Sequence, residues 1–352
     1  MKKTLSICND VPDNFLQLFA ENGPFSQLVE DARAPGNSID LQFRNTQGTK
    51  PWATLYLGTS KIVDIYFSDR RGLMIKPQKS KKLFREQLSG FWERHPNLGD
   101  QWDKWESIAD ASESWASAGA DLIETLGNAE SEASGRTGSG SEGYLQAGIA
   151  KPGFFDRWSI INRESIVSFE NKAQRRNQLQ RARKPVDVVV ESIRSKDTPW
   201  ARSEKHFGNK LDALGIDNDG NLLAIEVKGG YATAGVGWTP AQVVVYKRLL
   251  QEWLEETTED PQEVLGKSLR QRQSLGLAGS QELAPDFKII PVIVIGEIKS
   301  KSSAETATQR MNEVWDALDE NGNDLKDLRI FQLEGTDLHC FEIGRGEPLR
   351  SV

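Results

Sequence analysis

Three charged side chains interrupt two apolar segments that a short turn separates. Asp212 lies inside the first segment, and Glu226 and Lys228 lie at the end of the second. The Asp219-Gly220 pair between the segments is typical of a tight β-hairpin. The two-residue period of a strand places Glu226 and Lys228 on one face, and the turn folds Asp212 back beside them. The sequence therefore predicts that an Asp, a Glu and a Lys gather on one sheet.

These residue types suit the hydrolysis of a phosphodiester bond. Asp212 and Glu226 offer hard oxygen ligands for Mg²⁺ or Mn²⁺, and the main-chain carbonyl of Val227 is a third candidate ligand. Such an ion lowers the pKa of a bound water, and Lys228 is placed to orient that water or to stabilise negative charge. The competing interpretation is a buried network of ion pairs, because burying three charges is costly unless they pair or bind a metal.

The segments that must position these residues alternate between helix and strand. Ahead of the hairpin we expect a mostly helical stretch over 154–183 that Pro185 ends. After the hairpin we expect a helix over 239–256, a nearly all-apolar strand over 288–297, a helix over 304–318, and strands over 328–333 and 338–343. This alternation predicts an α/β domain built on a mixed sheet.

With its hairpin and the following helix, the pattern of Asp212 and Glu226-Val227-Lys228 resembles the PD-(D/E)xK, or restriction-endonuclease-like, nuclease superfamily. The likeness is greatest over 192–254, and the NucS, resolvase-type and RecB-like nuclease domains are the most similar branches. Leu211 stands where the superfamily usually has a proline before the Asp. The resemblance implies a restriction-endonuclease-like mixed sheet flanked by helices, and a Mg²⁺-dependent deoxyribonuclease whose catalytic residues are the Asp, Glu and Lys of the motif.

The helix expected after the hairpin carries a second pattern. Gln242 and Tyr246 are four residues apart and therefore share one helical face. Nucleases of the RecB-like branch carry a similar Gln-x-x-x-Tyr, which implies a contact with DNA near the metal. The alternative is that residues 239–242, with Pro240 at the start of the helix, form a capping box.

The resemblance also implies a further acidic residue from an upstream helix. Glu191 follows apolar residues that could pack on the sheet, whereas Glu204 is the nearest in sequence to Asp212. The sequence leaves four candidates open, which are Glu164, Glu170, Glu191 and Glu204.

Charge is unevenly distributed along the chain, whose net charge is −7. Basic residues gather over 70–85 and over 172–184, and the second run lies shortly before the hairpin. An acidic protein needs a local basic surface to hold a polyanion. We therefore expect the second run to bind DNA phosphates through Arg175, Arg176, Arg181 and Arg183. The alternative is a solvated helix face that binds nothing.

Composition divides the 352-residue chain into three parts. Residues 1–130 predict an α+β module that recognises substrate, regulates, or joins a second copy or a partner protein. Residues 131–150 are rich in Gly and Ser and predict a flexible linker. Residues 151–352 are expected to be the nuclease domain. Within the first part we expect helices over 14–28 and 82–108, and strands over 39–43, 53–57 and 61–67.

Other features narrow the class of protein. No apolar run reaches the roughly 18 residues that span a bilayer. Two cysteines and three histidines argue against a disulfide framework and a histidine-rich metal centre. No nucleotide-binding fingerprint is present. We expect a cytoplasmic endonuclease that acts on DNA rather than RNA. Stand-alone nucleases joined to an unfamiliar module resemble bacterial anti-phage or repair systems, and by this analogy we expect a role in one of the two. The alternative is a non-catalytic or complex-dependent nucleic-acid-binding subunit that retains the nuclease fold.

Overall fold

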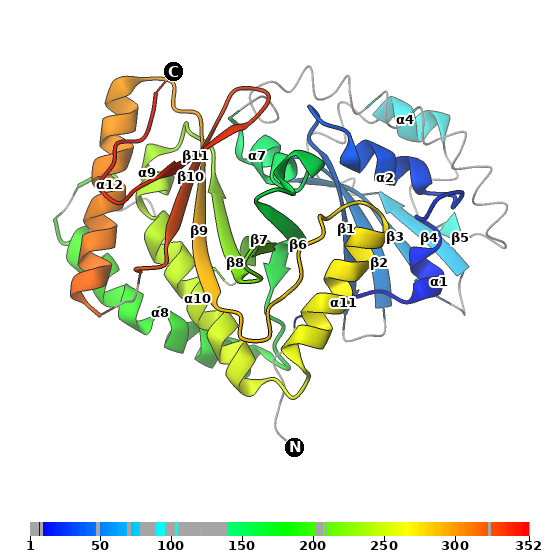
Figure 1. The fold of residues 1–352 in the computed structure, drawn as a ribbon, viewed down its shortest axis with the longest axis horizontal. Coiled ribbons are helices and arrows are strands. Elements are labelled where there is room, and N and C mark those ends of the chain that lie inside the picture. The colour runs from blue at the N-terminus through cyan, green and yellow to red at the C-terminus, as the bar shows by residue number, and fades with distance from the viewer. Residues whose placement is uncertain are drawn as a thin grey trace.

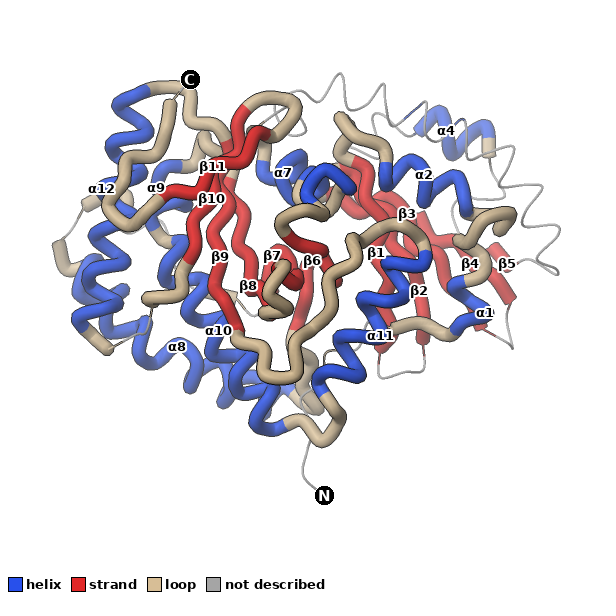
Figure 2. The backbone as a smooth tube through the Cα atoms, in the orientation of Figure 1, coloured by secondary structure: helices blue, strands red, loops and turns tan. Residues whose placement is uncertain are grey.

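The computed structural model contains two β-sheets, each with its own helices, that lie side by side (Figure 1). Figure 2 shows the same arrangement by secondary structure. The structure describes residues 7, 10–46, 50–68, 72–77, 89–95, 103–104, 121, 125, 140–196, 198–201, 207–208, 210–322 and 325–351.

The N-terminal sheet is antiparallel, and its strands follow one another in chain order. They are β1 (Ile39–Thr46), β2 (Lys50–Leu57), β3 (Ser60–Ser68), β4 (Gly72–Pro77) and β5 (Asp103–Lys104). The strands expected over 53–57 and 61–67 are confirmed as β2 and β3, which form a hairpin, and Gly58 supplies the positive φ of its turn. Leucines and phenylalanines make up much of the core beneath this sheet, where Phe19 contacts Phe25 and Phe43.

The helices of this half are short. They are α1 (Asp13–Leu16), α2 (Ser26–Arg33) and α4 (Ser89–Arg94). The helix expected over 14–28 is therefore two short helices, because the chain turns at Asn22, whose φ is +67°, and at Gly23. Of the helix expected over 82–108, the structure describes α4, and most of the remainder lies outside the described residues.

The C-terminal sheet is mixed and has the order β11-β10-β9-β8-β7-β6. Its strands are β6 (Trp158–Ile166), β7 (Lys210–Asp217), β8 (Leu222–Lys228), β9 (Ile289–Gly296), β10 (Arg329–Glu334) and β11 (His339–Ile343). The three central strands β8, β9 and β10 are parallel, and the outer pairs are antiparallel. The expectation of an α/β fold with a mixed sheet is confirmed.

Helices cover both faces of this sheet. On one face lie α8 (Lys172–Arg194), α9 (Thr233–Gly237), α10 (Thr239–Glu256) and α12 (Lys301–Glu320). On the other face lie α7 (Glu142–Gly148) and a 3₁₀ turn (Pro152–Phe154). Every residue of β9 is buried, as expected for a strand covered on both sides. No helix in the described ranges combines the length and apolarity that crossing a bilayer requires.

Two expectations upstream of the hairpin are wrong. Residues 158–166 form the strand β6 rather than a helix, because Ile160 and Ile161 pack into the cores on opposite faces of the sheet. Pro185 does not end a helix but lies inside α8. A proline within a helix costs about 3 kcal/mol. Val186 and other buried residues at helical spacing follow it, and burying one such side chain contributes about 1.5–3 kcal/mol. Their burial explains why α8 continues to Arg194.

The expected linker over 131–150 is wrong in its second half. Residues 142–148 form α7, in which every residue after Glu142 is buried. Ser141 caps this helix, because its hydroxyl accepts a hydrogen bond of 3.2 Å from the Tyr144 amide. Residues 131–139 lie outside the described residues. A further helix that the sequence did not predict, α11 (Pro261–Ser274), lies between the two sheets and contributes residues to the C-terminal core (Figure 1).

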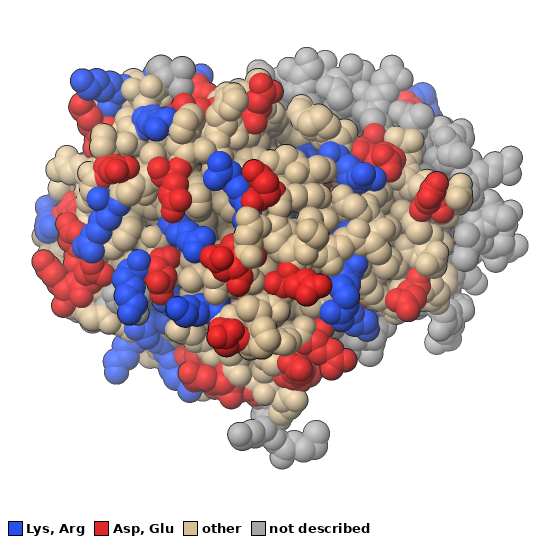
Figure 3. Space-filling view, viewed as in Figure 1, with Lys and Arg blue, Asp and Glu red and all other residues tan. Residues whose placement is uncertain are grey.

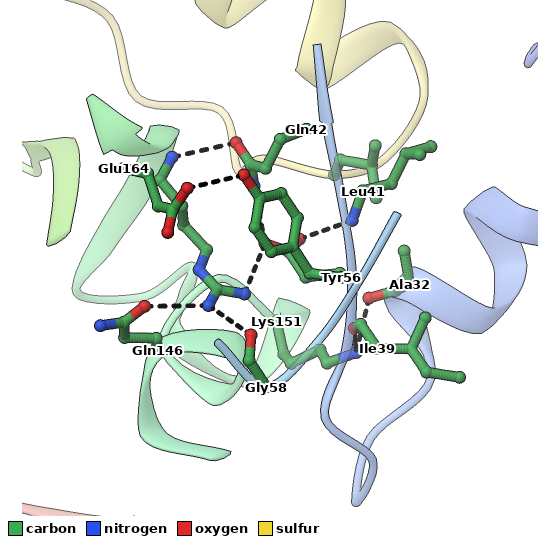
Figure 4. Close-up of polar contacts among 12 residues, drawn as sticks. Ala32, Ile39, Leu41, Gln42, Tyr56, Gly58, Gln146, Lys151 and Glu164 are labelled. Atoms are coloured by element: carbon green, nitrogen blue, oxygen red, sulfur yellow. Dashed lines mark hydrogen bonds and ion pairs between the residues drawn. The ribbon is translucent and has the colours of Figure 1, made fainter. Parts of the chain in front are cut away.

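Buried polar contacts fasten the two sheets together. Arg163 of β6 is fully buried and donates to the Asp40 carboxylate (3.0 Å), the Gly58 carbonyl (2.8 Å) and the Gln146 side chain (3.0 Å). Beside it, the Lys151 ammonium donates to three acceptors of the N-terminal half, including the Ala32 and Ile39 carbonyls, each 2.7 Å away (Figure 4).

We expect Asp40→Ala to lower the free energy of unfolding by about 3–5 kcal/mol, because the variant leaves the Arg163 guanidinium buried without its counter-charge. Urea unfolding measures the loss. Glu30→Ala is the control, since it removes an exposed ion pair with Arg33 (3.2 Å) worth about 1 kcal/mol or less. Equal losses in the two variants would contradict a structural role for the buried pair.

Candidate active site

The β7–β8 hairpin brings the three predicted residues together. Ala213 lies opposite Ile225 in the antiparallel ladder, so the next position places Asp212 opposite Glu226. The Asp212 carboxylate accepts a hydrogen bond of 2.9 Å from the Val227 amide, which ties the two strands at this point. Glu226 and Lys228 continue the row of Leu222 and Ala224, which faces the helices α8, α10 and α12.

Glu226 is a buried acid with incomplete compensation. Its residue is 1% exposed, and its Oε1 lies 2.5 Å from the Lys228 ammonium. Its Oε2 is buried and has no hydrogen-bond partner among the described residues. Burial raises the pKa of Glu226 well above its usual value, the negative charge of Asp212 raises it further, and Lys228 opposes both. Lys228 therefore compensates only one oxygen of this carboxylate, and no described group donates to the other.

Lys228 is the cation at this point of the sheet. Burial by itself lowers the pKa of its ammonium group, but the carboxylates of Glu226, Asp212 and Glu142 outweigh burial and raise the pKa above its ordinary value. The ammonium therefore stays protonated at neutral pH, and it can donate hydrogen bonds but cannot act as a base.

Glu142 is a third carboxylate that the sequence reasoning missed. It lies in the first turn of α7, and its Oε2 is 3.9 Å from the Lys228 ammonium. Burial raises the pKa of Glu142, Lys228 lowers it, and Asp212 raises it again. The Gly- and Ser-rich composition hid this residue. The available signal was Ser141, a typical N-cap, ahead of the apolar Tyr144-Leu145.

Exposure increases outward across the site. The side chain of Glu226 is 2% exposed, that of Lys228 is 16% exposed, and that of Glu142 is 40% exposed. The site is therefore most open on the side of α7, where Glu142 and Lys228 are more exposed than Glu226.

The arrangement fits a divalent cation held by few protein ligands. The unpartnered Glu226 Oε2 and the Asp212 carboxylate belong to directly opposed residues of the ladder, and the main-chain carbonyl of the next residue, Val227, is a third candidate ligand. Within the described residues, no group of three or more Asp, Glu, His or Cys side chains is arranged to hold a metal. Two carboxylates completed by water molecules suit Mg²⁺, which keeps much of its hydration shell, better than an ion that requires a full protein cage.

Three of the four acids that the sequence offered lie in the described part of the chain, and none of these three pairs with Lys228. Glu164 on β6 has a φ of +50°, and its carboxylate accepts a hydrogen bond of 2.9 Å from the Tyr56 hydroxyl and pairs with Lys210 (Figure 4). Burial raises the pKa of Glu164, but the hydrogen bonds from Lys210 and Tyr56 outweigh it and lower the pKa. Glu170 and Glu191 are exposed, and Glu204 lies outside the described residues.

Gln242 and Tyr246 lie on α10, the helix that packs on the face of β8 carrying Glu226. Tyr246 is 5% exposed, and Gln242 is half-buried with a side-chain oxygen that has no hydrogen-bond partner among the described residues. The expected capping box does not form, because the Thr239 hydroxyl instead donates to the Val236 carbonyl (2.7 Å).

The four arginines of the basic run on α8 have different surroundings. Arg181 pairs with the Glu256 carboxylate at 2.8 Å, and Arg183 donates to the main-chain carbonyl of Phe207. Arg175 and Arg176 are exposed near the start of the helix. Figure 3 shows acidic and basic side chains interspersed over the face in view. Most of the other basic run, 70–85, lies outside the described residues.

Glycines allow the chain to turn closely past the end of β8. A Cβ atom at Gly230 would lie 1.8 Å from the Glu297 carbonyl oxygen, and one at Gly229 would lie 3.0 Å from the Gly140 carbonyl oxygen. The segment then enters α9, where a Cβ at Gly235 would be 3.6 Å from the Lys228 side chain. Close packing therefore fixes the backbone of residues 229–235, which lies beside the Lys228 side chain.

We expect metal binding to depend on pH through Glu226. Above pH 4.5, the ordinary pKa of a glutamate, the folded protein retains a proton on Glu226 that the unfolded chain has released. The metal-free protein therefore loses stability as the pH rises toward the folded-state pKa. A cation must displace the same proton, so its affinity rises with pH.

Mn²⁺ should accordingly raise the Tm of the wild type more at about pH 8 than at about pH 5.5. Glu226→Gln should lose most of the Mn²⁺-dependent rise at both pH values. Glu320→Gln, at the exposed end of α12, is the control and should keep it. A rise of the same size in Glu226→Gln as in wild type would remove the metal from this site.

Comparison of the chain with known protein families, with curated proteins and with solved structures finds no match. The functional argument therefore rests on the geometry of the site.

Proposed function

We propose that this protein is a metal-dependent endonuclease that hydrolyses phosphodiester bonds in DNA, with its active site at the ends of β7 and β8. The observation that carries the proposal is the buried, unpartnered Oε2 of Glu226 beside Asp212, next to a single bonded ammonium, that of Lys228. Buried carboxylates that outnumber the positive groups bonded to them are unfavourable unless a cation binds between them. The mixed sheet, the Asp on one hairpin strand and the Glu-x-Lys on the other support membership of the restriction-endonuclease-like group.

Each residue then has a defined task. Asp212 and Glu226, with the Val227 carbonyl, would hold a Mg²⁺ or Mn²⁺ ion, which supplies a Lewis acid and a water of lowered pKa. Lys228, protonated throughout, donates hydrogen bonds to a phosphate oxygen and stabilises the negative charge that develops there. Glu142 is more exposed than Glu226, and its raised pKa makes it a better proton acceptor than an ordinary glutamate. We assign it to accept the proton of the attacking water.

We expect Asp212→Asn and Lys228→Met each to reduce Mg²⁺-dependent cleavage of DNA at least about a hundredfold, because each removes a charge that acts on the transition state. Glu142→Gln should cost about tenfold or more, as the loss of a proton acceptor does. The measurement is cleavage of linear, nicked, branched and single-stranded DNA by purified protein in Mg²⁺, Mn²⁺ and EDTA.

Asp219→Asn is the matched control, because this carboxylate lies exposed in the turn of the same hairpin, and Glu191→Gln on α8 is a second control. Both should cleave as wild type does. Unchanged cleavage in Asp212→Asn and Lys228→Met would leave the triad as a structural ion network. Folded protein that binds DNA without cleaving it would favour a non-catalytic or complex-dependent subunit.

Contacts with DNA phosphates should come from the exposed part of the basic run. Arg175→Gln and Arg176→Gln should each weaken DNA binding and lower the slope of log affinity against log salt by about 0.9, as each lost phosphate contact does for duplex DNA. Arg181→Gln should lower the slope less, because a phosphate would have to displace the Glu256 carboxylate from Arg181. Fluorescence anisotropy over a range of salt concentrations measures the slope. Wild-type slopes in all three variants would show that this helix face is only solvated and binds no DNA.

A further inference from the structure

An exposed aromatic ring stands at the edge of the proposed active site. Tyr231 follows Lys228 by three residues and exposes 55% of its surface. Among the described residues, it is one of two large hydrophobic side chains with such exposure, and the other, Val188, lies on α8. An exposed tyrosine ring offers an aromatic face on which a ligand base can stack.

The backbone that presents this ring is fixed by close packing. Gly230, immediately before Tyr231, lies so near the end of β9 that a Cβ would meet the Glu297 carbonyl oxygen at 1.8 Å. On its other side the chain enters α9, which packs against α12. A Cβ on Gly140 would lie 3.6 Å from the Tyr231 hydroxyl. Tyr231 is therefore held in a defined place next to the segment that leads into α7 and Glu142.

A cation accompanies the ring. The Lys299 ammonium, on the segment that follows β9, lies 5.0 Å from the centroid of the Tyr231 ring. An aromatic face together with a positive charge matches a nucleotide, because the base stacks on the ring and the phosphate attracts the ammonium.

We propose that Tyr231 and Lys299 form a stacking platform for an unpaired nucleobase next to the scissile phosphate. This inference rests on the proposed nuclease function and narrows its substrate. Three residues span at most about 10 Å of chain, so the ring lies within a few nucleotides of Lys228, at about 3.4 Å per nucleotide of a strand. In an intact duplex, both faces of each internal base are occupied by its neighbours. The platform therefore selects DNA with unpaired nucleotides at the cleavage point, such as a single strand, a flap or a frayed end.

The test is fluorescence of 2-aminopurine placed in a single-stranded oligonucleotide, with the full-length wild type and with Ca²⁺ in place of Mg²⁺ to hold the complex uncleaved. Stacking on the ring should quench the fluorescence. Tyr231→Ala should abolish the quenching at one or two positions and weaken binding of single strands by about tenfold or more. Tyr231→Trp should restore both, and affinity for a blunt duplex of the same sequence should not change. Val188→Ala is the control and should bind as wild type does.

Two outcomes would overturn the platform: quenching that survives in Tyr231→Ala, or an equal loss of affinity for single strands and duplex. The second outcome would mean that Tyr231 supports the structure of the site or contacts a protein, rather than stacking on an unpaired base. Cleavage in Mg²⁺ is measured in parallel. If wild type cleaves and Tyr231→Ala keeps the wild-type preference between single-stranded and duplex DNA, the platform alone fails. If wild type cleaves no DNA with any metal, the proposed function itself fails.

Discussion

The burial of the Glu226 carboxylate is the constraint on which the rest of the site depends. Three carboxylates, those of Glu226, Asp212 and Glu142, surround the single ammonium of Lys228. In a poorly solvated environment, like charges repel strongly and an unpaired charge is costly. The site therefore relieves its own electrostatic strain in one of two ways, by retaining protons or by taking up a cation. A divalent cation that needs few protein ligands satisfies the second.

The fold produces this constraint through several independent elements. The hairpin sets Asp212 opposite Glu226, and α10 covers the face from which Glu226 would otherwise reach water. The helix α7 approaches from the opposite face of the sheet and adds Glu142 at the strand end. These elements come from separate parts of the sequence, so the site exists only once the whole C-terminal domain is assembled.

The N-terminal sheet is linked to the same region. Arg163, at the centre of the buried contacts between the sheets, lies opposite Ala213, one residue from Asp212. Its neighbour Glu164 holds Lys210, which is two residues before Asp212 on the same strand. A displacement of the N-terminal sheet would therefore be transmitted to β7. Separating the two halves would break the buried pair of Arg163 and Asp40, which is costly.

Much of the geometry of the candidate site could be predicted from sequence, because it is local. The apolar alternation around Asp219-Gly220 specifies the hairpin, and the two-residue period then places Glu226 and Lys228 on one face. The strand over 288–297 was equally readable from its uniform apolarity, and the structure confirms it as Ile289–Gly296.

What could not be predicted depends on contacts distant in sequence. Gly143 looked like part of a flexible segment, yet it is a packing glycine, because a Cβ there would lie 2.7 Å from the Thr59 amide nitrogen. Composition cannot distinguish a glycine that frees the chain from one that lets two segments touch. The helix α11 was not predicted for a related reason, since its buried Arg272 and Gln271 bond to Leu41 and Val11 of the N-terminal half.

The most direct measurement of the central claim is the location of a metal ion by anomalous diffraction from crystals of the full-length protein soaked in Mn²⁺. The account predicts an anomalous peak at coordination distance from Glu226 Oε2 and an Asp212 carboxylate oxygen, at the carboxyl end of β8. The same soak of Glu226→Gln should show no peak there. A wild-type crystal in which Mn²⁺ binds elsewhere, while the Glu226 Oε2 remains without a partner, would contradict the account.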